Sequence, residues 1–127
     1  MSEYYRFVVN DKGIYEAVEC DCPKTDLRRK NKPDGSWLTK IGIKYPGAIS
    51  FWTKPGLKKY LQSGLMGWHK SVVKGEVKII IIEEPKNILF RDQDQIIVNP
   101  KDIQIKKTIS LKDFFKTKIA IFKTIEC

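Results

Sequence analysis

The chain predicts a single α+β domain that is rich in strands, with one main helix and short accessory helices. Hydrophobic residues make up 42% of its 127 residues, which is enough for a core. Short β-branched or aromatic runs recur along the chain, and a segment near the middle has the caps and periodicity of a helix. No low-complexity linker interrupts it, so we expect one domain over residues 1–127.

The first third begins with a strand. Residues Tyr4–Val9 are aromatic or β-branched apart from Arg6, a composition typical of strands. Asn10–Gly13 has turn residues, and Ile14–Glu19 carries apolar residues at helical spacing. Residues 23–44 show no regular pattern, so we expect a long basic loop there.

The middle third predicts a strand that leads directly into the main helix. Ala48–Trp52 is the strand, and Thr53 is a good helix N-cap because its hydroxyl can accept from first-turn amides. Pro55 suits the first turn, where no amide partner is lost. Gly64 is the expected helix stop, and Leu65–Val73 predicts a second turn or short helix.

The last third is mostly strand. Glu76–Ile82 is strongly apolar, which indicates a central strand. Ile88–Phe90 and Gln95–Val98 flank a polar turn, and Asp102–Lys107 alternates polar and apolar residues. Two further elements are expected: a short helix at Leu111–Phe115 and a final strand at Ile119–Ile125.

The positive charge is concentrated in the middle of the chain. The net charge is +9, and residues 23–75 hold twelve Lys and Arg residues against two Asp. Such a block can attract the phosphates of nucleic acid or nucleotides, or an acidic protein surface. The alternative is a Lys-rich solubilising surface, which explains the total charge better than it explains the concentration in one segment. The candidate partner-binding residues are Arg28, Arg29, Lys30, Lys32, Lys58 and Lys59.

Composition argues against a metal site and a membrane segment. With one His in the chain, the Cys20-x-Cys22 pair lacks the partners of a zinc site, and we expect free thiols in a reducing cytoplasm. The N-terminus does not predict a signal peptide, and the longest apolar run, Ile79–Ile82, is far too short to span a bilayer. We therefore expect a cytoplasmic protein; the oligomeric state stays open.

Motifs for familiar chemistries are scarce. His69 has the pKa of a general base, but no Ser, Cys or Asp stands at a recognisable triad spacing. No glycine-rich phosphate loop occurs. Phe51, Trp52 and Trp68 could stack a base, or they could equally be core.

Three short motifs occur in an informative order: Tyr5-Arg6-Phe7, Ser50-Phe51-Trp52-Thr53 and Gln93-Asp94-Gln95-Ile96-Ile97-Val98. In this the chain resembles the ADP-ribosyltransferase superfamily. That family has an Arg on its first strand, a Ser-Thr-Ser-like motif on its second and a catalytic Glu that opens a later strand. The resemblance implies a split β-sheet that holds NAD.

The resemblance also implies roles for individual residues. Arg6 would hold a phosphate or ribose, Ser50 and Thr53 would support it, and Trp52 and Tyr60 would wall the nicotinamide. The catalytic position departs from the family, because Asp94 or Gln95 stands where a Glu belongs. Gln95 can hold a hydroxyl but carries no charge, so transferase activity is left open.

Each of these residues also has a simpler interpretation. Arg6 could face outward from an edge strand, Ser50 could lie on the polar face of a strand, and Thr53 could serve as a cap alone. An alternative function is therefore a non-catalytic basic protein. It would bind nucleic acid, or act as a phage-type inhibitor of a host nucleic-acid-targeting defence complex.

Overall fold

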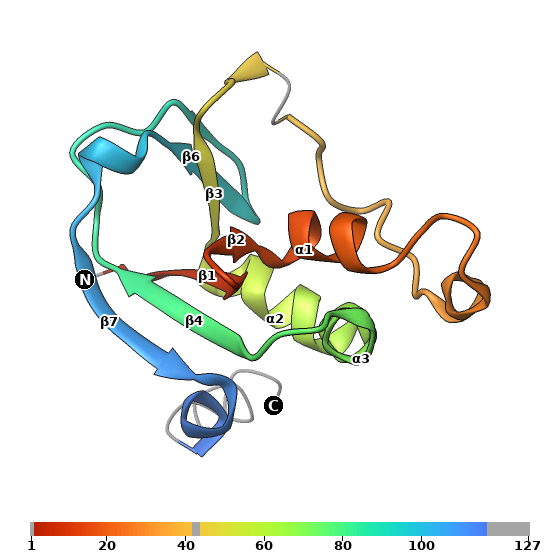
Figure 1. The fold of residues 1–127 in the computed structure, drawn as a ribbon. Coiled ribbons are helices and arrows are strands. Elements are labelled where there is room, and N and C mark those ends of the chain that lie inside the picture. The colour runs from red at the N-terminus through yellow and green to blue at the C-terminus, as the bar shows by residue number, and fades with distance from the viewer. Residues whose placement is uncertain (1, 42–43, 117–127) are drawn as a thin grey trace.

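The computed structural model describes residues 2–41 and 44–116 (Figure 1). These residues form a seven-stranded antiparallel sheet with the order β5-β6-β3-β1-β4-β7, and β2 pairs with β1 beside this path. Helices pack against the sheet, so the predicted α+β class is confirmed. The strands are β1 (Tyr4–Val9), β2 (Lys12–Gly13), β3 (Ile49–Trp52), β4 (Val77–Ile82), β5 (Phe90–Arg91), β6 (Gln95–Val98) and β7 (Ile105–Ser110).

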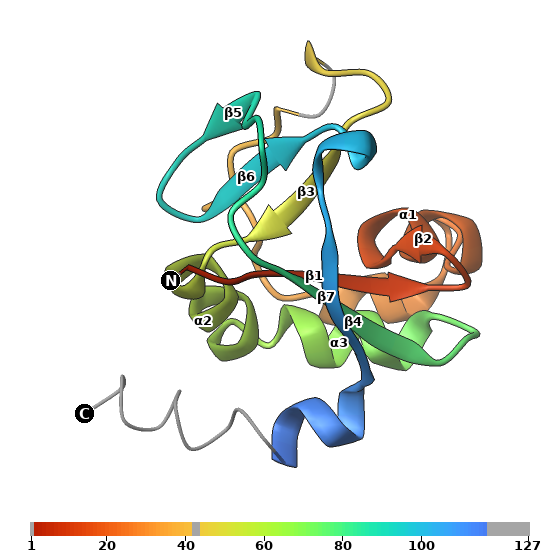
Figure 2. The same cartoon turned by 90° about the vertical axis from the view of Figure 1, so that its left-hand side faces the viewer.

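Three helices of similar length accompany the sheet, where the sequence singles out one main helix. They are α1 (Ile14–Asp21), α2 (Lys54–Gln62) and α3 (Leu65–Val72). Residues 111–116 are also helical, and 3₁₀ turns form at η1 (Leu27–Asn31) and η3 (Pro100–Asp102). In Figure 2, α2 and α3 lie together along one side of β1 and β4.

A tight turn brings the start of α1 back beside β1. Asn10 and Asp11 have φ values of 50° and 66°, and they connect Val9 to its partner Lys12. Two central residues with positive φ define the hairpin turn whose twist suits antiparallel strands, and Asn and Asp tolerate it best after Gly. The turn places Gly13 and the first residues of α1 next to the middle of β1.

The start of α2 forms as its sequence predicts. Thr53 is the N-cap, and its Oγ1 accepts from the Gly56 amide at 3.1 Å. Pro55 lies in the first turn, where its missing N–H has no intrahelical partner to lose. After α2, Gly64 adopts a left-handed conformation with φ of 84°, which redirects the chain into α3.

The sheet divides into two parts between β1 and β3. These strands share one residue pair, Tyr5 with Trp52, whereas β1 and β4 pair over six residues and β3 and β6 over four. Figure 1 shows the result: β3 and β6 run steeply across the direction of β1 and β4. The two parts therefore meet at a corner and open away from each other.

Buried residues fill both faces of the sheet. The larger cluster joins β1 and β4 to the helices and includes Phe7, Leu57, Ile79 and Phe114. The smaller cluster lies on the opposite face, around Tyr4, Phe51, Ile82, Ile96 and Val98. The apolar run Ile79–Ile82 is thus covered on both sides, as its composition predicts.

Two predicted strands differ from the structure, and a third cannot be compared. β5 is reduced to Phe90–Arg91 because Ile88 packs against the smaller cluster instead. The strand predicted at Asp102–Lys107 is displaced to Ile105–Ser110, since η3 occupies its start. The final strand predicted at Ile119–Ile125 lies outside the described residues.

Candidate ligand pocket

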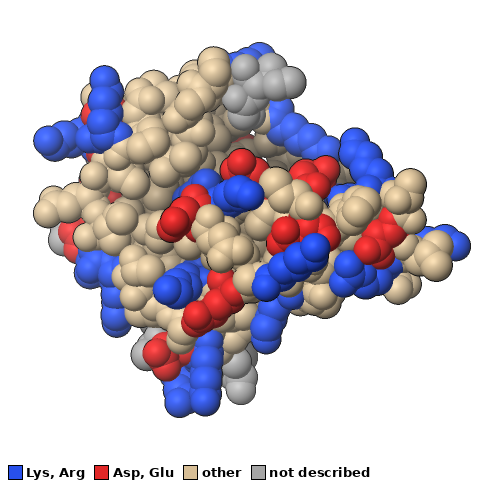
Figure 3. Space-filling model, in the orientation of Figure 1, with Lys and Arg blue, Asp and Glu red and all other residues tan. Residues whose placement is uncertain are grey.

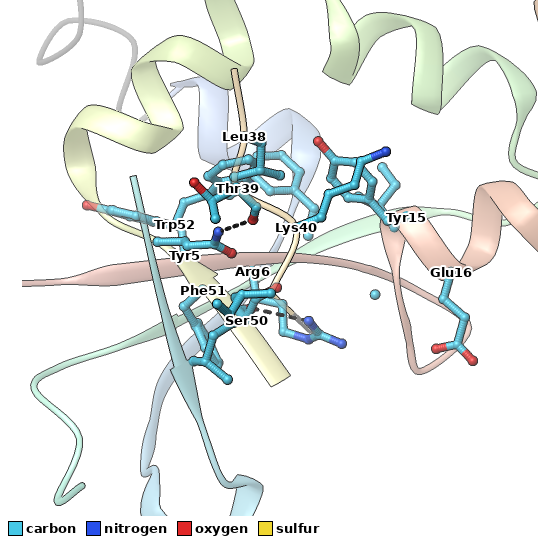
Figure 4. Close-up of a pocket in the computed structure, with 16 residues that line it drawn as sticks. Tyr5, Arg6, Tyr15, Glu16, Leu38, Thr39, Lys40, Ser50, Phe51 and Trp52 are labelled. Atoms are coloured by element: carbon cyan, nitrogen blue, oxygen red, sulfur yellow. Dashed lines mark hydrogen bonds between the residues drawn. The ribbon is translucent and has the colours of Figure 1, made fainter. Parts of the chain in front are cut away.

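A pocket of about 340 Å³ opens where the two parts of the sheet diverge (Figure 4). Small-molecule pockets usually measure roughly 300–1,000 Å³, so this one suits a small ligand or part of a larger one. Five stretches of the chain line it: residues 5–7 of β1, 13–16 at the start of α1, 38–41 of the long loop, 50–52 of β3, and Gln95 and Ile97 of β6.

Arg6 lies at the centre of the corner between β1 and β3. Its Nη1 donates to the Ser50 carbonyl oxygen at 3.2 Å, which connects the two strands where their ladder has ended. The guanidinium group fits because residue 13 is Gly: a Cβ there would lie 2.7 Å from Arg6 Nη2. Burial lowers the pKa of Arg6, while the Glu16 carboxylate nearby raises it.

The other arginines of the described chain have acidic partners. They pair as Arg28 with Asp26 at 2.8 Å, Arg29 with Glu19 at 3.7 Å and Arg91 with Glu84 at 2.8 Å. Arg6 makes no ion pair with any carboxylate that the structure describes, although it is partly buried. Among the described arginines, Arg6 is thus the one without a carboxylate at ion-pair distance, and its guanidinium group is left to the Ser50 carbonyl oxygen and the pocket.

Trp52 provides an aromatic wall to the pocket. Its ring stacks on Tyr60 with centroids 4.9 Å apart and an interplanar angle of 24°, and it also contacts Trp37 at 5.8 Å. Tyr60 is completely buried and does not line the pocket. Tyr60 therefore lies behind the wall of this pocket, because the Trp52 ring stacks over it.

Behind this wall lies a buried hydrogen bond between Tyr60 and His69. The Tyr60 hydroxyl and His69 Nδ1 are 2.7 Å apart. Burial, with a smaller contribution from the positive charge of Lys32, lowers the pKa of His69 to about 4, and burial raises the pKa of Tyr60 well above its usual value. The imidazole is therefore neutral, the tautomer decides which of the two groups donates, and His69 acts as a packed structural residue.

Tyr15 connects this buried pair to the pocket. It lines the pocket, remains 40% exposed, and packs edge-on against His69 at 4.6 Å. Burial raises the pKa of Tyr15 to about 12, so its hydroxyl is a donor at neutral pH.

The turn before β6 separates the two candidates for the catalytic position. Asp92 Oδ1 accepts from the amides of Asp94 and Gln95 at 2.8 and 2.9 Å, which fixes the turn. Asp94 does not line the pocket, and its carboxylate pairs with Lys59 at 3.0 Å. Gln95 does line it, and its Nε2 donates to the Thr39 carbonyl oxygen at 2.7 Å. Of the two candidates, Gln95 is therefore the residue at the pocket, and its side chain is an amide, not a carboxylate.

Thr53 has a structural position. Besides capping α2, its Oγ1 donates to the Gln93 carbonyl oxygen at 2.7 Å, and its amide donates to the Asp94 carbonyl oxygen at 3.0 Å. These bonds dock the turn on the N-terminus of α2. Thr53 does not line the pocket, so its assignment as a ligand residue is not supported by its position.

The basic residues of the long loop contribute to its folding. Arg28 bonds to Asp26 and to the Ser71 carbonyl, and Arg29 donates to the carbonyls of Cys22 and Pro23. Lys30 and Lys32 of the loop are exposed. In α2, Lys59 pairs with Asp94 and lies 5.8 Å over the Trp37 ring, and Lys58 also makes contacts. Figure 3 shows Lys and Arg interspersed with Asp and Glu on the face in view.

Several pocket residues carry no signal in the sequence, among them Gly13, Tyr15, Glu16, Thr39 and Lys40. The Asn10-Asp11 turn is the one local clue, since it folds the start of α1 back over β1. Residues 38–41 reach the pocket through contacts with distant strands, which a local pattern does not reveal.

Two kinds of site receive no support from the part of the chain described. It contains no group of three or more His, Cys, Asp or Glu side chains that could hold a metal ion. None of its helices has the length and apolar character needed to cross a bilayer. Comparison of the chain with protein-family models, with curated proteins and with solved structures finds no match.

Proposed function

We propose that the chain is an ADP-ribosyltransferase-like domain that binds NAD or a related nucleotide in the pocket between β1 and β3, without transferring ADP-ribose. One observation carries the proposal. Arg6, Ser50 and Gln95 come from three strands far apart in the sequence, and all three line the same pocket. No described carboxylate lies within ion-pair distance of Arg6, and the Glu16 carboxylate at the same pocket acts on it only through space.

The chemistry of the pocket fits the two ends of such a ligand. A guanidinium group presents five N–H donors in a planar fork and binds phosphate or carboxylate in two-point contacts. The Ser50 carbonyl oxygen accepts one of the Arg6 donors and thereby sets the direction of the rest. Trp52 lines the pocket beside it and is 7% exposed, so it offers an apolar aromatic wall for the uncharged part of such a ligand.

The absence of transfer follows from position 95. Cleavage of a glycosidic bond develops positive charge on the sugar, and a carboxylate stabilises that charge where an amide does not. The residue at the pocket is Gln95, and Asp94 is turned to Lys59. An intact nucleotide is therefore the expected bound species.

Thermal denaturation with NAD, ADP-ribose, AMP and nicotinamide tests the proposal. A ligand at 100 times its Kd stabilises the folded chain by about 2.7 kcal/mol. We expect NAD and ADP-ribose to raise the Tm of the wild type, and Arg6→Ala to remove the shift. Arg91→Ala is the matched control, because Arg91 pairs with Glu84 away from the pocket. No shift with any of the four at millimolar concentration would refute the proposal.

A second variant moves Arg6 without removing its charge. In Gly13→Ala the new Cβ would lie 2.7 Å from the flexible end of Arg6, so the guanidinium group has to shift while the backbone conformation stays allowed. We expect loss of the ligand-induced shift with little change in the unliganded Tm. Gly67→Ala, where a Cβ meets open space, should behave as the wild type.

A further inference from the structure

Residues 38–41 form a roof over the pocket, and two contacts attach this roof to the sheet. All four residues line the pocket. At one end Trp37 packs on Trp52 with ring centroids 5.8 Å apart, and Leu38 packs against the larger core cluster. In the middle, the Thr39 carbonyl oxygen accepts from Gln95 Nε2 at 2.7 Å, drawn as a dashed line in Figure 4.

The Thr39 contact determines how the Gln95 amide is oriented. A backbone carbonyl can only accept, so the NH₂ group of Gln95 has to face it. Gln95 is 5% exposed, whereas Thr39 lies at the surface, so this hydrogen bond is partly buried. Its loss removes the partner of the buried Gln95 amide and so destabilises the closed arrangement of the roof.

A carboxylate at position 95 is incompatible with this contact. An ionised Glu has acceptors alone, and it would set two oxygens against each other at the 2.7 Å now occupied by an N–H···O bond. Gln95, the residue that departs from the ADP-ribosyltransferase pattern, is therefore also the residue that attaches the roof to the sheet.

We propose that Gln95 is a positioning residue: its amide holds residues 38–41 closed over the pocket, and a Glu at this position opens the roof. The roof contact itself exists in the unliganded chain. Its effect on a bound nucleotide rests on the proposed function, because only then does a ligand lie beneath the roof.

Limited proteolysis of the unliganded chain tests the roof directly. Lys40 is exposed and lies in the roof, so trypsin cleaves after it when the roof opens. We expect Gln95→Glu and Gln95→Met to accelerate this cleavage by up to about tenfold, the factor that corresponds to loss of one hydrogen bond of about 1.4 kcal/mol. Cleavage after Lys70 in α3 reports global unfolding and is measured in the same digest.

Gln104→Glu is the matched control for charge, because Gln104 is exposed and does not line the pocket. It should leave the ratio of Lys40 to Lys70 cleavage unchanged. Should both position-95 variants keep the wild-type ratio, the inference is overturned. The Met variant keeps the test valid if the Glu variant does not fold.

Acid rescue separates the specific bond from a general loss of packing. In Gln95→Glu, the protonated side chain regains an O–H that can donate to Thr39, whereas the side chain of Gln95→Met cannot donate at any pH. Acrylamide quenching of Trp fluorescence, which senses Trp37 and Trp52 at the roof together with Trp68 in α3, should be high in both variants at pH 8. It should fall in Gln95→Glu alone as the pH is lowered through the pKa of the new carboxyl, which burial raises above its usual value. The wild type, measured at the same pH values, corrects for the other charged and titratable groups near the roof: Tyr5, Arg6, Tyr15, Glu16, Lys40, Asp92 and Asp94.

Failure of this inference and failure of the proposed function look different. If the expected cleavage and acid rescue occur but no nucleotide binds, the role of Gln95 is supported and the proposed function is refuted. If NAD binds but dissociates at the same rate from the wild type and Gln95→Met, the proposed function is supported and the effect of the roof on the ligand is refuted. If NAD binds in the pocket and Gln95 holds the roof closed, the dissociation rate of NAD should rise about tenfold in Gln95→Met, in parallel with cleavage after Lys40.

Discussion

Acidification should destabilise the chain through His69, and the size of the effect can be worked out from its surroundings. His69 is 1% exposed, and burial with the charge of Lys32 lowers its pKa from 6.5 to about 4. Between these values the unfolded chain binds a proton that the folded chain does not. Stability is therefore complete above pH 6.5, falls as the pH drops towards 4, and changes no further below that.

The expected magnitude is large for a single residue. A difference of about 2.5 between the two pKa values corresponds to about 3 kcal/mol at full effect, and to about 2.5 kcal/mol at pH 4.5. This is a substantial part of the roughly 5–15 kcal/mol that keeps a small domain folded.

Urea denaturation at pH 7.5, 6.5, 5.5 and 4.5 measures the effect, with His69→Asn as the reference. Asn does not titrate, and its side-chain amide can accept from or donate to the Tyr60 hydroxyl, which now lies 2.7 Å from His69 Nδ1. The variant should be less stable at neutral pH, but the wild type should lose about 2.5 kcal/mol more between pH 7.5 and 4.5. Parallel curves for the two chains would refute the assignment of a buried neutral imidazole.

Three further predictions concern other contacts. In Gly56→Ala a Cβ would lie 1.9 Å from the Asp94 carbonyl oxygen. The gain in helix propensity of about 1 kcal/mol cannot offset this backbone clash, so the urea midpoint of the variant should fall. An unchanged midpoint would show that the turn does not pack against Gly56. Thr53→Val removes the α2 cap and the bond to the turn and should lower the free energy of unfolding by about 1–2 kcal/mol in urea titrations. Because Asp26 holds Arg28, Arg28→Ala should leave any binding of single-stranded DNA unchanged across a salt series; a steep salt dependence that this substitution weakens would favour the nucleic-acid hypothesis.

Elements with local signals could be predicted from the sequence. The aromatic composition of β1 and the apolar run of β4 identify strands, Thr53 marks the start of α2, and Gly64 marks its end. Each depends on residues within a few positions of one another, where side-chain spacing and capping chemistry decide the backbone.

The pocket depends on contacts that no local pattern contains. The order of Arg6, Ser50 and Gln95 pointed to one site, yet Tyr60 proved to lie behind Trp52, and Asp94 proved to face Lys59. The roof over Gln95 connects positions 56 residues apart, and the space for Arg6 depends on the absent side chain of Gly13. Such relations follow from the register of the sheet and from packing, which a single sequence specifies only through the complete fold.

The single pair between Tyr5 and Trp52 gives the molecule a joint. Ladders of four and six pairs make each part of the sheet stiff, so the joint is the place where the two parts can rotate against each other with the least loss of pairing. A rotation there would change the width of the pocket and the distance from Arg6 to Ser50 together. The width of the pocket would then depend on the angle between the two parts of the sheet, and substitutions at Tyr5 or Trp52 should alter the affinity for the proposed ligand through that angle.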